Sequence, residues 1–152
     1  MSTLEPGQSA PEFSVQNHRG ETVALRSLRE GGVVVVYFYP KDESPGCTAQ
    51  ACSFRDAYGD LVDAGAAVVG VSGDSVESHQ AFAERHGLPF HLVSDTDGAL
   101  RRAYGVKKTL GLLPGRETFV IDRQGMIRHV FRSQLMANKH VEEAVQAVRE
   151  LL

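Results

Sequence analysis

The residues of this chain best suited to covalent chemistry are its two cysteines, Cys47 and Cys52, which stand in a C-x4-C spacing. Cysteine pairs serve as redox couples, as metal ligands, or simply as small buried apolar residues. C-x2-C is the usual spacing for redox motifs and zinc half-sites, and a structural zinc site needs four ligands. The histidines that could complete such a site are scattered, at His79, His86 and His91. No metal site is therefore expected, whereas a redox pair and two buried apolar residues both remain open.

The position of Cys47 favours a reactive thiol. It follows the turn sequence Ser44-Pro45-Gly46 and opens a segment, Cys47–Val62, whose apolar residues recur every three or four positions. The cysteine is thus predicted in the first turn of a helix, where unpaired backbone N–H groups and the helix dipole favour an anion such as a thiolate. A thiolate alone is a modest catalyst, so the site must also supply fixed hydrogen-bond donors and a cation.

Cys52 lies five residues beyond Cys47 in the same predicted helix. Five residues of α-helix correspond to a rise of about 7.5 Å and a rotation of about 140°, which puts the two Cα atoms roughly 8.7 Å apart. A disulfide bond needs Cα atoms closer than about 7 Å. The two sulfurs can therefore bond only after the first turns of the helix unwind. We interpret the pair as a redox couple that alternates between a helical and a locally unfolded state.

The segment before the cysteines has the pattern of a strand buried on both faces of a sheet. Val33–Tyr39 is a run of β-branched and aromatic residues, and Pro40 ends it because proline lacks the N–H that a strand ladder needs. Ala66–Val71 has the same character. Strands that alternate with helical segments predict an α/β domain, with a mixed central sheet and helices on both faces. Sites in such sheets lie at the carboxyl ends of strands, which is where Pro40–Cys47 falls.

The remaining segments fit a single domain that covers residues 1–152. Alternation of polar and apolar residues at 14–25 predicts an N-terminal β-hairpin, and a second hairpin is expected at 118–131. A loop is expected at 109–115. The chain has no repeat or linker long enough to divide it, so one hydrophobic core is predicted.

Two helix starts are predicted from capping residues. Asp74 is followed three residues later by Glu77, a capping box for a helix that runs to His86. Asn138 is the expected cap of the last helix. The residues of that helix expected to face the core are Val141, Ala144, Val145, Val148 and Leu152.

Composition excludes several classes of protein. Apolar residues make up 42% of the chain, charged residues 23%, and the net charge is −3, so nothing indicates a nucleic-acid partner. The first residues lack a basic segment followed by an apolar run, and the longest apolar run, Val33–Tyr39, is too short to cross a bilayer. We therefore expect a cytoplasmic protein that does not interact with membranes. Thiols in that compartment are normally reduced, which favours reactive over structural cysteines.

The sequence around Cys47 resembles a known family. Pro40–Thr48 is similar to the peroxiredoxin active-site pattern P-x3-[T/S]-x2-C, and the longer FYPKDESPGCTAQACSFRD resembles the bacterioferritin comigratory protein branch, the Q-type peroxiredoxins. APEF at 10–13 and GRETFVID at 115–122 match in the same order. The resemblance covers essentially the whole chain. It implies a thioredoxin fold with an N-terminal extension, in agreement with the α/β prediction.

The resemblance also implies a role for each matching residue. Cys47 corresponds to the peroxidatic cysteine, which a peroxide oxidises to a sulfenic acid, and Cys52 to the resolving cysteine, which then forms an intramolecular disulfide. Ser44 takes the place of the hydroxyl that contacts thiolate and peroxide, where many members carry threonine. Arg116 corresponds to the arginine that holds the thiolate, and Pro40 to the proline that shields the pocket. The family implies hydrogen peroxide and organic hydroperoxides as substrates, thioredoxin or a similar dithiol as reductant, no cofactor, and a role in cell redox homeostasis.

Alternatives remain open for some of these residues and for the function. Taken without the family, the sequence favours a solvated charge at a strand edge for Arg116, and Pro40 is compatible with a simple strand terminator. Arg55 could reach the neighbourhood of Cys47, or pair with Asp56 or Glu43. A general disulfide oxidoreductase and a redox-sensing or holdase-like interaction protein are the competing functions. The single apolar face of the last helix is needed for the core, which predicts a monomer.

Overall fold

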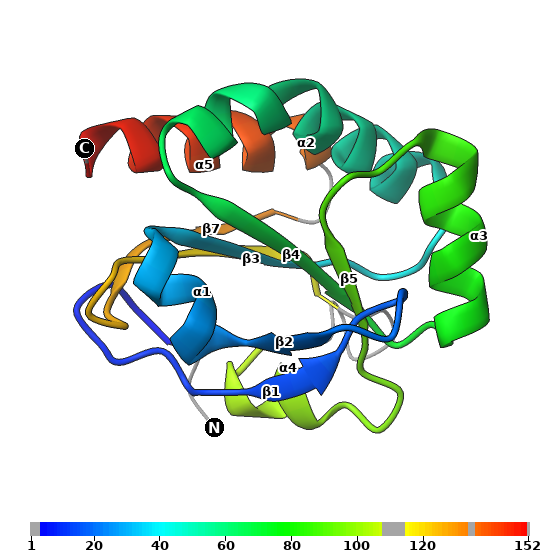
Figure 1. The fold of residues 1–152 in the computed structure, drawn as a ribbon, viewed down its shortest axis with the longest axis horizontal. Coiled ribbons are helices and arrows are strands. Elements are labelled where there is room, and N and C mark those ends of the chain that lie inside the picture. Colours follow the sequence, from blue (N-terminus) through cyan, green and yellow to red (C-terminus); the bar gives the residue numbers. More distant parts are fainter. Residues whose placement is uncertain (1–3, 108–114, 134–135, 152) are drawn as a thin grey trace.

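The computed structural model describes residues 4–107, 115–133 and 136–151, and Figure 1 shows their arrangement. A five-stranded sheet with the order β5-β4-β3-β6-β7 forms the centre of the fold. Its first three strands in space are parallel, and β6 and β7 run antiparallel to their neighbours. The strands of this sheet are β3 (Val34–Phe38), β4 (Ala67–Ser72), β5 (His91–Ser94), β6 (Glu117–Ile121) and β7 (Ile127–Arg132).

Helices cover both faces of the sheet, which confirms the predicted mixed α/β architecture. The long helices α2 and α5 lie along one face, with α3 beside them, and α1, α4 and a small hairpin cover the other (Figure 1). The antiparallel hairpin of β1 and β2 is the expected N-terminal extension. The bounds of these elements are β1 (Ser14–Gln16), β2 (Thr22–Ala24), α1 (Leu25–Gly31), α2 (Pro45–Asp63), α3 (Val76–His86), α4 (Ala99–Ala103) and α5 (Ala137–Glu150).

The central strand β3 divides the hydrophobic core into two halves. All five of its residues are buried, as its continuous apolar run predicts. Because side chains alternate along a strand, Val35 and Tyr37 pack in the cluster under α2 and α5. Val34 and Phe38 pack in the cluster on the opposite face. Residues 10 and 25 belong to that second cluster, so the N-terminal extension closes the core on the face away from α2.

The register of the sheet brings two distant segments together at one end. Phe38, the last residue of β3, pairs with Glu117, the first residue of β6. The residue before β6, Arg116, therefore lies beside the segment that leaves β3 at Pro40. Antiparallel pairing thus positions an arginine next to the turn that leads into the cysteine helix.

Two predicted helix starts were wrong by a few residues. Helix α2 begins at Pro45 rather than at Cys47, because proline at the first position of a helix needs no N–H partner and already has a helical φ. The cap of α3 is Ser75 rather than Asp74, and its hydroxyl accepts from the backbone N of Ser78 at 3.1 Å. Asp74 is unavailable as a cap because its carboxylate accepts from the backbone N of Asp42 at 2.8 Å.

The last helix also starts earlier than predicted. Met136 is the residue before α5, so Asn138 lies inside the helix, where its Oδ1 accepts a hydrogen bond from Ser53 on α2 at 3.0 Å. Val141, Ala144 and Val148 are buried as predicted, and Val145 packs partly buried against the same core. Leu152 and the expected loop at 109–115, apart from Gly115, lie outside the described residues. No helix within the described ranges is long and apolar enough to cross a membrane.

Candidate active site

Cys47 is buried in the first turn of α2, at the carboxyl end of β3. Ser44 is the residue before the helix and has an extended backbone, Pro45 is the first helical residue, and the backbone N of Thr48 donates to Ser44 O at 2.8 Å. The Cys47 side chain is only 1% exposed and belongs to the apolar cluster that contains Phe54. The sulfur therefore lies at a helix N-terminus and in an apolar setting, two conditions that strengthen any charge interaction made there.

Arg116 provides the cation that the sequence analysis required. Its Nη2 donates to Cys47 Sγ at 3.4 Å, and the residue is only 6% exposed. Gly46 leaves room for the guanidinium beside the sulfur. A Cβ at this position would lie 3.1 Å from Arg116 Nη2, a tight contact. A solvated charge at a strand edge is therefore excluded for Arg116.

Gln50 is a member of the site that the sequence analysis missed. Its Oε1 accepts from Arg116 Nη1 at 2.5 Å, and its side chain is fully buried. Gln50 lies three residues after Cys47, so both side chains project from the same face of α2. That spacing was the available signal. Its Nε2 has no hydrogen-bond partner among the described residues, which leaves a buried donor next to the thiol.

The other predicted site residues lie close to Cys47 in the chain and differ in their contacts. Pro40 is half-buried where the chain leaves β3. The Ser44 hydroxyl donates to Lys41 O at 2.9 Å and so closes the turn before α2. Cys52 is half-buried in α2, and both cysteines are free thiols. Both cysteines lie in the continuous helix α2, so the separation of roughly 8.7 Å between their Cα atoms that helical spacing predicts applies to this reduced form.

Arg55 takes one of the two positions considered for it. Its Nη2 lies 3.1 Å from Asp56 Oδ1, and its Nη1 donates to the carbonyl oxygen of His86 at 2.7 Å. Glu43, the other acidic candidate, instead lies beside His86 and Arg85 of α3. Arg55 thus binds α2 to the end of α3 and contributes no contact to Cys47 among those observed.

Comparison with known proteins places this chain in a family. The AhpC/TSA family matches residues 6–130. The chain belongs to the AhpC/TSA family. Curated relatives carry the name peroxiredoxin Q: the chloroplastic protein of Sedum lineare is 47% identical over 152 residues, which cover 99% of this chain and 81% of the relative. The chloroplastic protein of Populus jackii is 45% identical over 99% of this chain and 71% of its own length.

Solved structures of the same branch share the fold. Peroxidoxin BcpB of Mycobacterium tuberculosis superposes with a TM-score of 0.91 at 33% identity, over 98% of this chain and 99% of the other. The bacterioferritin comigratory protein of Xanthomonas campestris gives 0.83 at 34% identity, over 91% of each chain. The AhpC/TSA chain described here is accordingly a peroxidase of the oxidoreductase class, in the peroxiredoxin Q branch, with the thioredoxin fold that the sequence predicted.

Burial keeps two tyrosines near the peroxiredoxin site in their protonated form. Tyr37 and Tyr39 are fully buried, and desolvation raises the pKa of each well above its usual value. For Tyr37 the next largest cause is the negative charge of Cys47. The Tyr39 hydroxyl donates to Asp42 Oδ1 at 2.6 Å, whereas the Tyr37 hydroxyl is without a hydrogen-bond partner in the described ranges. Neither phenol is thus suited to act as a base.

His140 supports the backbone of Arg116 through Ser133. Its Nε2 lies 2.7 Å from the Ser133 carbonyl, which can only accept, so Nε2 donates and Nδ1 accepts from the Thr118 hydroxyl at 2.7 Å. Ser133 in turn donates its backbone N to Arg116 O at 3.3 Å. Desolvation, opposed by the Ser133 carbonyl and reinforced by the charge of Arg116, lowers the pKa of His140 to about 4. His140 is therefore neutral near pH 7 and fixes the backbone from which Arg116 extends.

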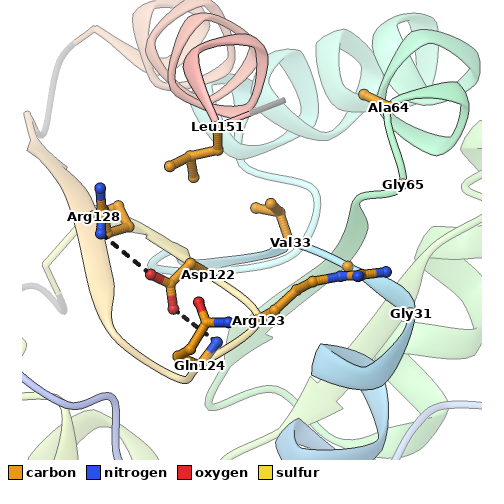
Figure 2. Close-up of a pocket in the computed structure, with 10 residues that line it drawn as sticks. Gly31, Val33, Ala64, Gly65, Asp122, Arg123, Gln124, Arg128 and Leu151 are labelled. Atoms are coloured by element: carbon orange, nitrogen blue, oxygen red, sulfur yellow. Dashed lines mark hydrogen bonds and ion pairs between the residues drawn. The ribbon is translucent and has the colours of Figure 1, made fainter.

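Two clefts in the described part of the chain lie at opposite ends of the central sheet. One of about 460 Å³ opens at the amino end of β3, where Gly31, Gly65, Asp122 and Arg128 line it (Figure 2). A second, of about 440 Å³, lies beside the first turn of α2 and includes Gly46 in its lining. The second is adjacent to the reactive cysteine in the chain, and the first is at the far end of the sheet.

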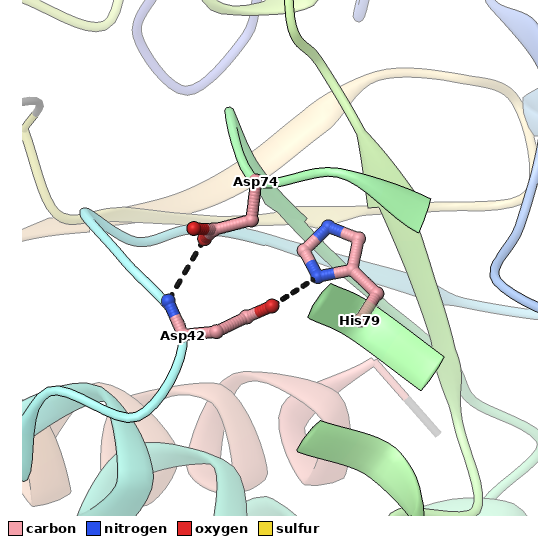
Figure 3. A group of neighbouring side chains, drawn as sticks. All are labelled: Asp42, Asp74 and His79. Carbon is pink, nitrogen blue, oxygen red and sulfur yellow. Dashed lines mark hydrogen bonds and ion pairs between the residues drawn. The ribbon is translucent and has the colours of Figure 1, made fainter. Parts of the chain in front are cut away.

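His79, which the sequence analysis grouped with scattered histidines, joins two carboxylates next to the site. Figure 3 shows its ring beside the Asp42 carboxylate, with the Asp74 side chain above them. One ligand-type atom from each of the three lies within 4.8 Å of the others, a spacing that a metal ion could use. The facing atoms are already engaged with one another, because Asp42 Oδ2 lies 2.7 Å from His79 Nδ1 and Asp74 Oδ2 accepts from the backbone of Asp42. The described contacts thus give this cluster a hydrogen-bonding role.

Proposed function

We propose that the chain is a thiol peroxidase in which Cys47 reduces hydrogen peroxide and organic hydroperoxides. The thiolate attacks the terminal peroxide oxygen, a sulfur–oxygen bond forms as the O–O bond breaks, and the leaving oxygen takes up a proton and departs as water or an alcohol. The observation that carries the proposal is the hydrogen bond from Arg116 Nη2 to Cys47 Sγ, 3.4 Å long, in the first turn of α2. A buried guanidinium at this place stabilises both the thiolate and the charge that develops on the leaving oxygen.

Ser44 and Pro40 complete the proposed site. In the proposal the Ser44 hydroxyl, now bonded to Lys41 O at 2.9 Å, donates to the thiolate and to the bound peroxide. Pro40 limits access of water to the sulfur. The position of both residues in the turn that leads from β3 to Cys47 supports these roles.

Cys52 is the proposed resolving residue. Its thiol attacks the sulfur of the Cys47 sulfenic acid, a disulfide forms, and the sulfenic oxygen leaves as water. Both cysteines lie in α2, so the first turns of the helix must unwind before the sulfurs meet. A dithiol such as thioredoxin then supplies two electrons and two protons and restores both thiols. The half-buried position of Cys52 and its free thiol support this step.

A cleft next to Cys47 supports organic hydroperoxides as substrates. It lies between the starts of α2 and α5, has a volume of about 440 Å³, and is partly apolar. The Xanthomonas campestris relative was studied for its alkyl peroxide reduction activity, in agreement with a substrate that carries a tail. The residues that line the cleft are Gly46, Ala49, Met136, Ala137, Asn138, Lys139 and Glu142.

The proposed setting is that of a single-domain monomer in the cytoplasm, with a part in redox homeostasis. The apolar face of α5 supports the monomer, because its described residues Val141, Ala144 and Val148 are already buried in the core. Peroxide and a dithiol reductant are the proposed partners, rather than nucleic acid or a membrane. Light scattering at micromolar concentration tests whether the protein is a monomer. Cell fractionation tests the cytoplasmic location, because the relatives from Sedum lineare and Populus jackii are named chloroplastic.

Peroxide consumption by the wild type, Cys47→Ser and Cys52→Ser tests the proposed function. We expect the wild type to turn over with thioredoxin, thioredoxin reductase and NADPH, and Cys47→Ser to be inactive. Cys52→Ser should consume one equivalent of peroxide per chain and accumulate the sulfenic acid, seen by mass spectrometry after trapping. Activity retained by Cys47→Ser would overturn the assignment. Reduction of insulin disulfides without peroxide would instead favour a general oxidoreductase, and disulfide formation without turnover a redox sensor.

A further inference from the structure

The turn that precedes Cys47 contains a strained residue. Glu43 has φ 65°, and it is the one residue other than glycine with a positive φ in the described part of the chain. A side chain in this left-handed region costs roughly 1–2 kcal/mol, so surrounding contacts must hold it. Glu43 lies between Asp42 and Ser44, immediately before α2. The contacts that hold this turn therefore set where α2 begins and where Cys47 lies.

Asp42 is fixed through both its side chain and its backbone. Its side chain is almost wholly buried, its Oδ1 accepts from Tyr39 at 2.6 Å, and its Oδ2 accepts from Ser78 at 2.8 Å. The same Oδ2 lies 2.7 Å from His79 Nδ1 (Figure 3). Its backbone N donates to Asp74 Oδ2 at 2.8 Å. Contacts from the residue after β3, from the loop after β4 and from α3 thus converge on one residue of the turn before Cys47.

His79 is held as firmly on its other side. The ring is fully buried, and its Nε2 lies 3.1 Å from the backbone carbonyl of Val93 on β5. That carbonyl can only accept, so Nε2 carries a hydrogen. The ring therefore bridges the central sheet and the turn, and both of its nitrogens are used. A buried pair of this kind is costly to break, because removal of one partner leaves the other unpaired.

A second, outer contact joins the same turn to α3. Glu43 Oε1 lies 2.9 Å from His86 Nε2, and Glu43 Oε2 lies 3.5 Å from Arg85 Nη1. The Glu43 side chain is 39% exposed and that of Arg85 is 68% exposed, so solvent screens this contact. Asp42 and Glu43 are adjacent, and each contacts a histidine of α3. The buried pair of Asp42 with His79 can therefore be compared directly with the outer pair of Glu43 with His86.

We propose that Asp42 and His79 are positioning residues for Cys47, a fixed anchor for the turn that carries the reactive thiol. The inference rests on the proposed function, in which the first turns of α2 unwind to form the disulfide and refold to restore the site. The anchor binds the turn to α3, to the loop after β4 and to β5, none of which has to move. Refolding then returns Cys47 to the same place beside Arg116, 3.4 Å from its guanidinium. Without the anchor the turn relaxes at Glu43, and the thiolate loses its fixed donors.

Asp42→Asn tests the anchor, with Glu43→Gln as the matched control. Both changes convert a carboxylate to an amide of the same shape, one in the buried contact and one in the outer contact. Quenched-flow alkylation and mass spectrometry would follow the loss of the Cys47 thiol with hydrogen peroxide, and then the appearance of the disulfide. We expect Asp42→Asn to slow the first step at least tenfold and to leave the second within about twofold. Glu43→Gln should leave both steps within about twofold.

The split between the two steps separates positioning from a purely structural role. All rates are compared at a temperature where circular dichroism shows each variant folded, so a lower melting temperature by itself does not change them. His79→Gln, which keeps an amide donor toward Asp42, should react at a rate between those of the wild type and Asp42→Asn. A folded Asp42→Asn that reacts as fast as the wild type would overturn the proposal, and so would equal losses in Asp42→Asn and Glu43→Gln. A wild type that fails to react with peroxide would instead contradict the proposed function.

Discussion

The two ends of the central sheet are built in opposite ways. At the carboxyl end of β3, Cys47 and Arg116 are almost wholly buried, and polar side chains pair with one another inside the protein. At the amino end, a cleft of about 460 Å³ is open, and the ion pair of Arg128 with Asp122 leaves the arginine side chain 54% exposed (Figure 2). A cleft of similar volume, about 440 Å³, lies at the carboxyl end, and one of about 600 Å³ lies beside the N-terminal hairpin. The site is therefore recognised by its buried polar contacts rather than by the volume of its cleft.

Burial explains why this difference matters for chemistry. A charge near Cys47 acts through protein rather than water, so one hydrogen bond from a guanidinium has a large effect on the thiolate. The same guanidinium at the amino end would be screened by solvent. Substitutions at the carboxyl end should consequently change reactivity, and those at the amino end should change stability alone.

The largest expected effect is that of Arg116→Gln. Loss of a fixed charged donor at a reacting centre typically lowers the rate by about 100- to 1,000-fold, and we expect this loss in the reaction of Cys47 with hydrogen peroxide. Competition with a haem peroxidase of known rate measures it without the need for tryptophan, which this chain lacks. Arg128→Gln at the amino end is the control and should react as the wild type does. A loss smaller than tenfold for Arg116→Gln would remove the main support for the site.

Gly32→Ala should have the next largest effect, and on stability only. A Cβ at Gly32 would lie 2.0 Å from the carbonyl oxygen of Gly65, and the residue has φ 144°. Overpacking together with backbone strain predicts a loss of about 2–4 kcal/mol in the free energy of unfolding, measured by urea denaturation. The rate of Cys47 with peroxide, per folded molecule, should not change.

The neighbouring glycine provides the control for this prediction. Gly31 has no atom within 4 Å of an added Cβ and closes α1. Gly31→Ala should therefore be neutral or slightly stabilising, since alanine favours a helix by up to about 1 kcal/mol. If both alanine variants lost equal stability, the close approach of Gly32 to Gly65 would not be the cause. If Gly32→Ala slowed Cys47, the two ends of the sheet would not be independent.

The sequence predicts those features of the fold and of the site that depend on residues close together in the chain. The strand before Pro40, the turn and the cysteine helix follow from alternation, proline chemistry and helical periodicity over about 25 neighbouring residues. Arg116 is 69 residues from Cys47, and family resemblance rather than spacing indicated its role. The register of β3 with β6 explains that contact, and register depends on long-range pairing.

The residues that sequence reasoning missed have partners set by tertiary packing. His79 meets Asp42 across 37 residues because α3 packs beside the catalytic turn, and nothing near His79 in the chain indicates this. The prediction that Asp74 caps α3 was wrong for the same reason, because the Asp74 carboxylate accepts a hydrogen bond from the backbone N of Asp42. Gln50 was within reach of the sequence, because its spacing from Cys47 places both on one face of a helix.

The smallest of the expected effects concerns acid stability and the buried histidine next to Arg116. The folded protein keeps His140 neutral down to its lowered pKa of about 4, whereas an unfolded histidine takes up a proton near pH 6.5. Below pH 6.5 the unfolded state therefore binds more protons at this residue, and stability falls as the pH falls. His140 does not lower the free energy of unfolding above about pH 6.5. As the pH approaches 4, its lowered pKa reduces that free energy by about 2–3 kcal/mol.

Urea denaturation at intervals between pH 7 and pH 4 measures this loss, and His140→Gln isolates it. The glutamine can donate to Ser133 but does not titrate, so the variant should be less stable at pH 7 and lose less between pH 7 and pH 4. His129→Gln is the control, because His129 is half-exposed on β7 and pairs with Glu143 near solvent. If the free energy of unfolding fell equally with pH in the wild type and in His140→Gln, acid would destabilise the protein through other groups. A steeper slope in the wild type places an acid-sensitive group at the same end of the sheet as the thiol, beside Ser133, whose backbone N donates to Arg116 O.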